Sequence, residues 1–314
     1  MKEFFSCLSL PDLAPCPIPK ETILCLGNFD GVHLGHRSLL DAAKGLQRAA
    51  SKKLPCGVFC FHGLSSDFLC KDPPKHLDSE EKRLEKFAEC GMDFVIFADF
   101  ARICDLSPAD FIGSVLLDIC HAKSVVCGEN YRFGKGGQGT PDLLSKTRDL
   151  SVKVLPELVI DGFTVSSTRI RRLLEEDGNA KEAARLMSCP YTLTARVEHG
   201  KGLGHKLGVP TINQSFPPLA LIPKHGVYFT QARVGKTCYP AISNVGLRPS
   251  VEETDAVNCE TNLFSFSGSL YEETVTIEFL DWLRAEQTFS SEEELQCAIQ
   301  NDIALAKDYF AKKQ

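Results

Sequence analysis

Several features are missing from this sequence, and each absence excludes a class of protein. No apolar run approaches the roughly 20 residues needed to cross a bilayer, so we expect no membrane association. The start, Met-Lys-Glu-Phe-Phe, lacks the charged, apolar and small-residue sections of a signal peptide, which predicts a cytoplasmic protein. The basic residues are scattered and the net charge is −6, so nucleic acid is not an expected partner.

The fourteen cysteines also lack the spacing of a metal site or a disulfide framework. No C-x-x-C pair occurs, the closest spacing is Cys56 to Cys60, and the histidines do not stand near cysteines at ligand spacing. In a reducing compartment such cysteines are small buried hydrophobes. With no internal repeat, 314 residues and 43% hydrophobic content predict two globular domains.

The first half alternates short apolar runs with helical segments. The expected strands are 22–26, 56–61, 93–97, 123–127 and 152–160. The expected helices are 37–51, 79–90 (with a capping box of Asp78 and Glu81) and 108–122 (with Ser107-Pro108 at its start), and Thr140-Pro141 opens another. This alternation predicts a parallel sheet covered by helices, with ligands at the carboxyl ends of the strands.

The pattern changes near Ser188-Cys-Pro190, where we place the boundary between domains 1–187 and 188–314. The strands expected after it are 191–198, 227–234, 259–266 and 273–279, spaced as in a β-sandwich or β-barrel. One amphipathic helix over 290–312 closes the chain.

The segment GNFDGVHLGH at 27–36 joins the first of these strands to a helix and places His33 and His36 on either side of Gly35. Free N–H groups at a helix N-terminus favour a phosphate, and imidazoles can donate to phosphoryl oxygens. We therefore expect a nucleotide triphosphate site here. The alternative is that the glycines only shape a turn while the histidines face water.

The segment CGENYRFGKGGQGT at 127–140 follows another strand. It formally contains G-x-G-x-x-G, but five residues separate this motif from the strand, which excludes a dinucleotide fingerprint, and no Walker A loop is present. Asn130 and Arg132 are candidates to reach a ligand; a mobile surface loop is the alternative.

The third segment, Ser166-Ser-Thr-Arg-Ile-Arg171, opens the helix expected over 167–177. Serine is an ordinary N-cap, so simple capping is one interpretation. Arg169 and Arg171 in the first turn oppose the helix dipole, and a nearby anion would offset this. Hydroxyls, amides and guanidinium groups together can clamp a phosphate.

In this order, the three segments resemble the adenylyltransferase half of the bacterial bifunctional riboflavin kinase/FMN adenylyltransferase (FAD synthetase) family. The second half resembles the riboflavin kinase half in four segments: GKGLGHKLGVPTIN at 200–213, SNVGLRPSV at 243–251, CETNLF at 259–264 and FLDWLRAEQTF at 279–289. The resemblance implies a Rossmann-like α/β nucleotidyltransferase domain with a parallel sheet, followed by a β-barrel riboflavin kinase domain with a terminal helix. It also implies a magnesium-dependent enzyme that makes FMN from riboflavin and ATP, then FAD from FMN and ATP.

For the first site the resemblance implies that His33 and His36 are catalytic and hold the ATP phosphates. Asn28, Gly35, Ser167, Thr168 and Arg169 would also bind ATP, and Asn130 would seat the flavin. The FMN phosphate then attacks the α-phosphorus of ATP and pyrophosphate departs, which requires only positioning and charge neutralisation. A protonated histidine would stabilise the growing charge.

For the kinase site the resemblance implies that Gly202 and Gly204 approach the ATP phosphates and that Thr211 and Asn213 bind Mg²⁺ through oxygen. Glu260 is the candidate base that takes the proton of the ribityl hydroxyl. Arg284 is the candidate to contact the flavin; a surface arginine is the alternative.

One segment of the first half departs from the family. Phe61-His-Gly-Leu-Ser65 stands where an acid and two prolines are usual. This motivates one alternative, a riboflavin kinase with a degenerate adenylyltransferase domain. The other alternative is a non-catalytic regulator that binds flavin or nucleotide, and in every case we expect a monomer that associates at most weakly.

Overall fold

The computed structural model describes residues 6–10, 18–52, 54–200, 208–247 and 257–312. The chain divides into two compact units, residues 1–167 and 168–314, and each is described by itself. Among the described residues, no helix is long and apolar enough to span a membrane. The domain boundary expected at 187/188 stays a prediction.

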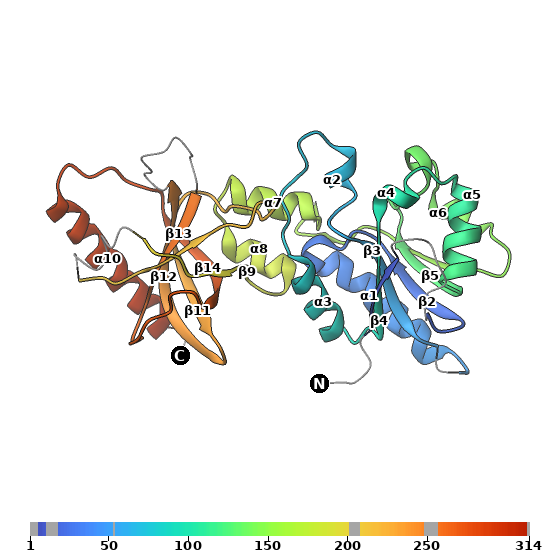
Figure 1. Cartoon of the computed structure of the whole chain (residues 1–314), viewed down its shortest axis with the longest axis horizontal. Coiled ribbons are helices and arrows are strands. Elements are labelled where there is room, and N and C mark those ends of the chain that lie inside the picture. Colours follow the sequence, from blue (N-terminus) through green and yellow to red (C-terminus); the bar gives the residue numbers. More distant parts are fainter. Residues whose placement is uncertain (1–5, 11–17, 53, 201–207, 248–256, 313–314) are drawn as a thin grey trace. The chain divides into compact units, whose positions relative to one another are not determined.

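The first unit contains a six-stranded sheet in the order β1-β4-β3-β2-β5-β6, and all of its pairings are parallel (Figure 1). Its strands are β1 Ser6–Leu10, β2 Thr22–Leu26, β3 Cys56–Phe61, β4 Phe94–Ala98, β5 Ala122–Gly128 and β6 Ser151–Leu155. The expected parallel sheet is confirmed, and β1 is an addition.

The strand expected over 152–160 is too long. β6 is an edge strand that ends at Leu155, directly before Pro156, which has no N–H to donate to the ladder with β5. Val159–Ile160 (β7) and Phe163–Thr164 (β8) form a separate antiparallel hairpin. Asp161 and Gly162 connect the two strands with φ of 55° and 79°, the left-handed conformation that such a turn requires.

Helices lie on both faces of this sheet (Figure 1). They are α1 Leu34–Ala49, α2 Ser66–Leu69, α3 Glu80–Glu89, α4 Phe100–Ile103, α5 Pro108–Asp110, a π-helix over Phe111–Ile119 and α6 Pro141–Ser145, with short 3₁₀ turns at Asp30–Val32 and Lys135–Gly137. α1 and α3 bury their apolar residues against one face, whereas the π-helix and α6 cover the other.

Three helix expectations need correction. α1 begins at Leu34 rather than Arg37, because His33 caps its N-terminus. The N-cap of α3 is Ser79, whose side chain accepts from Lys82 N–H, so Asp78 is not part of a capping box. The helix expected over 108–122 is π-helical from Phe111 and ends at Ile119.

Half of the cysteines whose side chains the structure describes follow the expectation of small buried hydrophobes. Twelve cysteines with described side chains carry free thiols, and six of them are buried: Cys25, Cys56, Cys60, Cys120, Cys127 and Cys259. Burial raises the pKa of Cys56 to about 12 and that of Cys127 and Cys259 to about 11. Cys70 and Cys297 are exposed.

The second unit is built on a six-stranded sheet in the order β10-β13-β12-β11-β14-β9, antiparallel throughout. Its elements are α7 Ser167–Glu175, α8 Ala180–Met187, β9 Tyr191–Arg196, β10 Ile212–Ser215, β11 Gly226–Val234, β12 Thr237–Leu247, β13 Val257–Leu263, β14 Thr274–Arg284 and α10 Glu292–Ala311. α7 begins at the last residue of the first unit. Of these elements, α8, β10 and β12 were not among those expected.

The sheet is nearly closed into a barrel. The edge strands β9 and β10 approach each other at a bridge between Glu198 and Asn213, and the buried Gln214 amide donates to the carbonyls of Ala195 and Val275. α10 packs on the outer face of β12, where Ala306 is buried with Val227 and Ile242. The expected barrel with a terminal helix is therefore confirmed.

Candidate active sites

The first candidate site lies where the order of the parallel sheet reverses. β2 has β3 on one side and β5 on the other, so the carboxyl ends of β2 and β5 are neighbours. The segment 27–36 leaves β2 there, and the segment beginning at Glu129 leaves β5. Open α/β sheets bind ligands at such a reversal. The fold therefore brings the first two sequence motifs to one edge.

The backbone of the turn adopts an uncommon conformation. Phe29, Gly31 and Val32 have φ of 55°, 81° and 40°, and a positive φ is a genuine outlier for a β-branched residue such as valine. A Cβ added to Gly31 would lie 2.9 Å from Leu77 Cδ1, so glycine is needed there for space as well. Surrounding contacts must hold this turn in place.

The structure places His33 and His36 in contact. Their rings stack with centroids 3.7 Å apart, and His33 Nδ1 accepts from His36 N–H at 3.3 Å. Since Nδ1 of His33 is an acceptor, its neutral ring carries the proton on Nε2. His33 is 4% exposed.

His36 is a partly exposed residue whose Nδ1 atom is buried and has no hydrogen-bond partner among the described residues. Burial, then the neighbouring His33 and Lys86, hold its pKa well below 6.5. His36 is therefore neutral near pH 7 in this structure. An anion bound beside it would raise that pKa.

Gly35 and Ser167 support the turn. A Cβ on Gly35 would lie 3.2 Å from the His33 ring and 3.3 Å from the Val165 carbonyl, so this position favours glycine. The Ser167 hydroxyl donates to the carbonyl of Asp30 at 2.9 Å. The start of the third motif is thereby joined to the first.

The unusual segment 61–65 is also joined to the turn. The Asn28 amide donates to the Ser65 hydroxyl at 2.9 Å, while the buried Arg83 guanidinium donates to the carbonyls of Asn28 and Phe61, each at 3.1 Å. The loss of the acid and the prolines has therefore not separated this segment from the site.

The loop over 128–140 is packed against the unit. Phe133 is 6% exposed, pairs with Gly139 in a β-bridge and belongs to the core. Asn130 is exposed at the end of β5, and its amide donates to Glu157 at 2.8 Å. Arg132 donates to the carbonyl of Tyr131 at 2.8 Å. The side chain of Asn130 is thus placed at the sheet edge but already bonded to a carboxylate.

Thr168 and Arg169 belong to the second unit. The Arg169 guanidinium lies 3.4 Å from the Glu182 carboxylate on α8, and Arg185 also pairs with Glu182. The anion expected near Arg169 is therefore present as a protein carboxylate.

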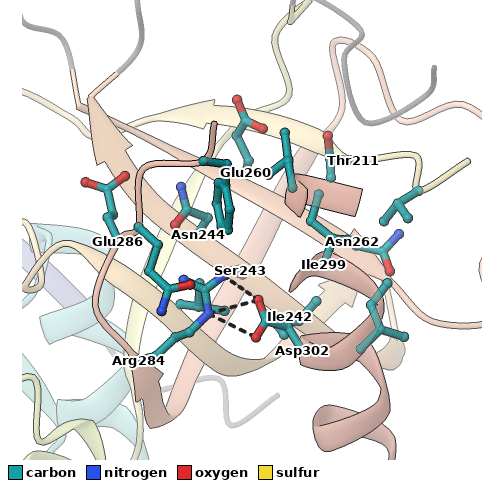
Figure 2. Close-up of a pocket in the computed structure, with 16 residues that line it drawn as sticks. Thr211, Ile242, Ser243, Asn244, Glu260, Asn262, Arg284, Glu286, Ile299 and Asp302 are labelled. Atoms are coloured by element: carbon teal, nitrogen blue, oxygen red, sulfur yellow. Dashed lines mark hydrogen bonds and ion pairs between the residues drawn. The ribbon is translucent and has the colours of Figure 1, made fainter. Parts of the chain in front are cut away.

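The second candidate site is a cavity of about 270 Å³ on the outer face of the barrel, beneath α10 (Figure 2). Apolar side chains form much of its wall, and these are Val209, Val227, Ile242, Phe289, Leu295, Ile299 and Ile303. Thr211, Asn244, Glu260, Asn262, Glu286 and Gln287 contribute its polar groups. An apolar cavity with a few polar groups is typical of a small-molecule site.

Glu260 and Asn213 stand side by side in this unit. They are direct partners in the β10–β13 register, and Asn244 of β12 pairs with Glu260 from the other side. The Asn258 amide donates to Asn213 Oδ1 at 3.1 Å and lies 3.4 Å from Glu260 Oε1. A Cβ on Gly200 would lie 2.4 Å from Asn213 Nδ2, so glycine leaves room for this amide.

Arg284 and Asp302 close the opposite end of the cavity from Glu260 and Thr211 (Figure 2). The guanidinium of Arg284 donates to both carboxylate oxygens of Asp302, at 2.6 to 3.1 Å. Their side chains are 22% and 8% exposed, so Arg284 is partly buried and paired with a buried carboxylate.

The described residues contain no cluster of three or more His, Cys, Asp or Glu side chains that could hold a metal ion. Thr211 and Asn213 offer neutral oxygens, which suits a hard cation that keeps several waters. Gly202 and Gly204 lie outside the described residues. The sequence did not identify Arg83, Lys86 or Asp302, because a charged residue in a helix is ordinarily solvated, whereas these three are buried.

Comparisons with known proteins agree in both units. The FAD synthetase family model matches residues 16–169 and the riboflavin kinase model matches 187–310. Bifunctional riboflavin kinase/FMN adenylyltransferases from Listeria monocytogenes and Escherichia coli K12 are each 32% identical, over 92% and 93% of this chain and 93% and 94% of their own. A Streptococcus pneumoniae crystal structure described as a macrolide-efflux protein aligns with a TM-score of 0.86 at 27% identity, covering 96% of this chain and 98% of that one.

Proposed function

The chain belongs to the bifunctional riboflavin kinase/FMN adenylyltransferase family, and we propose that its two reactions use the two sites described above. It phosphorylates riboflavin to FMN with ATP, then transfers the adenylyl group of a second ATP to FMN, which gives FAD and pyrophosphate. The alternatives, a kinase with a degenerate first domain and a non-catalytic regulator, are not favoured.

In the kinase reaction the isoalloxazine ring of riboflavin lies against the apolar wall of the cavity. The ribityl chain then extends toward Glu260, whose carboxylate accepts the proton of the terminal hydroxyl. The hydroxyl oxygen attacks the γ-phosphorus of ATP, and ADP leaves. Arg284 contacts the flavin at the other end. The observation that carries this assignment is the direct pairing of Glu260 with Asn213 beside an apolar cavity.

Thr211 and Asn213 are the residues we propose to hold Mg²⁺ together with the ATP phosphates. When bound, the ion neutralises phosphate charge. The two oxygens present suit this ion, because Mg²⁺ sites in phosphoryl-transfer enzymes commonly use few protein ligands. Gly202 and Gly204 would let the backbone approach the phosphates.

In the second reaction the turn over 27–36 receives ATP. His33 and His36 face the phosphates together with Asn28 and Gly35, and an oxygen of the FMN phosphate attacks the α-phosphorus in line. The bound triphosphate raises the pKa of His36, so ATP binding draws a proton to the stacked pair.

Four further residues are proposed for this reaction. Ser167, Thr168 and Arg169 would bind the triphosphate, and Asn130 would seat the flavin. In this role the Arg169 guanidinium would pair with the phosphates as well as with Glu182. The Asn130 amide would donate to the ligand instead of to Glu157.

The test separates the two activities in one protein. The purified enzyme is incubated with ATP, Mg²⁺ and either riboflavin or FMN, and the flavins are resolved by chromatography. His33→Ala should convert riboflavin only to FMN. Glu260→Gln should fail to make FMN from riboflavin, yet should convert supplied FMN to FAD. Full kinase activity in Glu260→Gln would refute the assignment of the base.

We place this enzyme in the cytoplasm. The support is chemical, because the twelve cysteines whose side chains are described carry free thiols, which persist in a reducing compartment. The expectation of a monomer stays a prediction.

A further inference from the structure

A buried stripe of α3 holds the turn over 27–36 from behind. Arg83 donates to the carbonyls of Asn28 and Phe61, and the ring of Phe87 packs edge-on against Phe29 with centroids 5.6 Å apart. Arg83 and Phe87 are at most 2% exposed. Positions i and i+4 of a helix lie on one face, so one side of α3 contacts the start of the turn twice.

Lys86 adds a third contact on the same face and closes a ring of hydrogen bonds. Its ammonium donates to the Gly31 carbonyl at 3.1 Å and to both oxygens of Asp78 at 2.7 and 2.8 Å. The backbone N–H groups of Leu77 and Asp78 donate in turn to the Asp30 carboxylate at 3.0 to 3.2 Å. Asp30 and Gly31 are adjacent, so the ring returns to the turn from which it began.

This ring lies directly before the catalytic pair in the chain. Gly31 precedes Val32, whose φ of 40° is unfavourable for valine, and Val32 precedes His33, the N-cap of α1. The ring thus fixes the carbonyl two residues upstream of His33 while the backbone at Val32 is held in a strained conformation. The side chains of Lys86 and Asp78 are only 2% and 3% exposed, so neither can reach a ligand through solvent.

We propose that Lys86, neutralised by Asp78, is a positioning residue for adenylyl transfer: it holds the Gly31 carbonyl and thereby sets the place of His33. This inference rests on the proposal that the turn over 27–36 is the adenylyltransferase site. Displacement of a reacting group by about 1 Å can slow catalysis roughly a hundredfold. The contribution of Lys86 should therefore appear in kcat, with little change in the KM for FMN.

The decisive variant is Lys86→Met combined with Asp78→Asn. Lys86→Met alone leaves a buried carboxylate without its partner, which destabilises the fold. The double variant removes both charges, so the folded state is retained, but the Gly31 carbonyl still lacks its donor. We expect the kcat for FMN to FAD to fall about 10- to 100-fold, with the KM for FMN within about threefold, in protein shown by circular dichroism to be folded at the assay temperature.

The matched control is Lys82→Met on the exposed side of the same helix, where Lys82 pairs with Glu85. It should retain both activities, and the double variant should phosphorylate riboflavin at the normal rate. Normal FAD formation by the folded double variant would overturn the inference. His33→Ala is measured alongside to separate the two claims. If both His33→Ala and the double variant make FAD normally, the proposed site itself is rejected. If His33→Ala loses FAD formation while the double variant keeps it, only the role of Lys86 is rejected.

Discussion

The ion pair between Arg284 and Asp302 allows a quantitative test, because it joins α10 to the last strand of the barrel. Three N–O distances of 2.6 to 3.1 Å connect the two groups, whose side chains are 22% and 8% exposed. Exposed pairs contribute about 0 to 1 kcal/mol, and removal of one partner from a buried pair costs about 3 to 5 kcal/mol. We expect an intermediate coupling energy of about 2 kcal/mol from a double-mutant cycle of Arg284→Ala and Asp302→Ala.

Urea unfolding measures this energy without interference from the first unit. Trp282 is the single tryptophan of the chain and lies in β14, so its fluorescence reports on the second unit alone. Asp308→Ala, an exposed position on the same helix, should change the unfolding free energy by less than about 0.5 kcal/mol. A coupling below about 0.5 kcal/mol between Arg284 and Asp302 would show that the pair does not hold α10 on the barrel.

Two further predictions concern the first unit, and both are measured by urea unfolding followed by circular dichroism. The folded pKa of His36 is lowered, so below about pH 6.5 the unfolded chain binds more protons than the folded chain. The free energy of unfolding should therefore fall by up to about 1.4 kcal/mol per pH unit as the pH drops. The His36→Gln protein should lose less stability between pH 7 and 5 than the parent, and equal losses in the two proteins would contradict the burial of a neutral His36. Gly139→Ala should lower the free energy of unfolding by about 1 to 3 kcal/mol, since the added Cβ would lie 2.5 Å from the Phe133 ring. Gly113→Ala, where the added Cβ meets open space, should be neutral or stabilising. A Gly139→Ala protein as stable as the parent would show that the loop shifts to accommodate the methyl group.

The sequence predicted those structural features that depend on residues close to one another along the chain. The strand before Gly27, the turn and the following helix all follow from local periodicity and glycine, and their parallel arrangement follows from strict alternation. The hairpin at 159–164 could also have been found, because Asp161-Gly162 is a recognised turn pair. β1 reads Ser-Cys-Leu-Ser-Leu, and its two serines interrupt the continuous apolar run that marks β2, Thr-Ile-Leu-Cys-Leu.

Contacts between residues far apart in sequence could not be predicted. Asp302 meets Arg284 across a loop and a helix, and nothing near either residue indicates the pair. Lys86 and Arg83 look like the solvated charges of an ordinary helix, yet both are buried because the turn offers them carbonyl oxygens. Partners that satisfy a buried charge are a property of the fold, so only the structure identifies them.

The closure of the barrel has a consequence for how substrate binding stabilises the second unit. β10 pairs with β13 over all four of its residues. Toward β9, the described residues give it no continuous ladder but the Glu198–Asn213 bridge, a hydrogen bond from the Ser215 hydroxyl to Glu198 at 2.9 Å, and the Gln214 amide. The strand proposed to hold Mg²⁺ is therefore also the seam of the barrel, and a seam with so few bonds opens at low cost in free energy. Any ligand that holds Asn213 in place also stabilises the contact between β10 and β9. The kinase unit should therefore be least stable without substrates and become more stable as they bind.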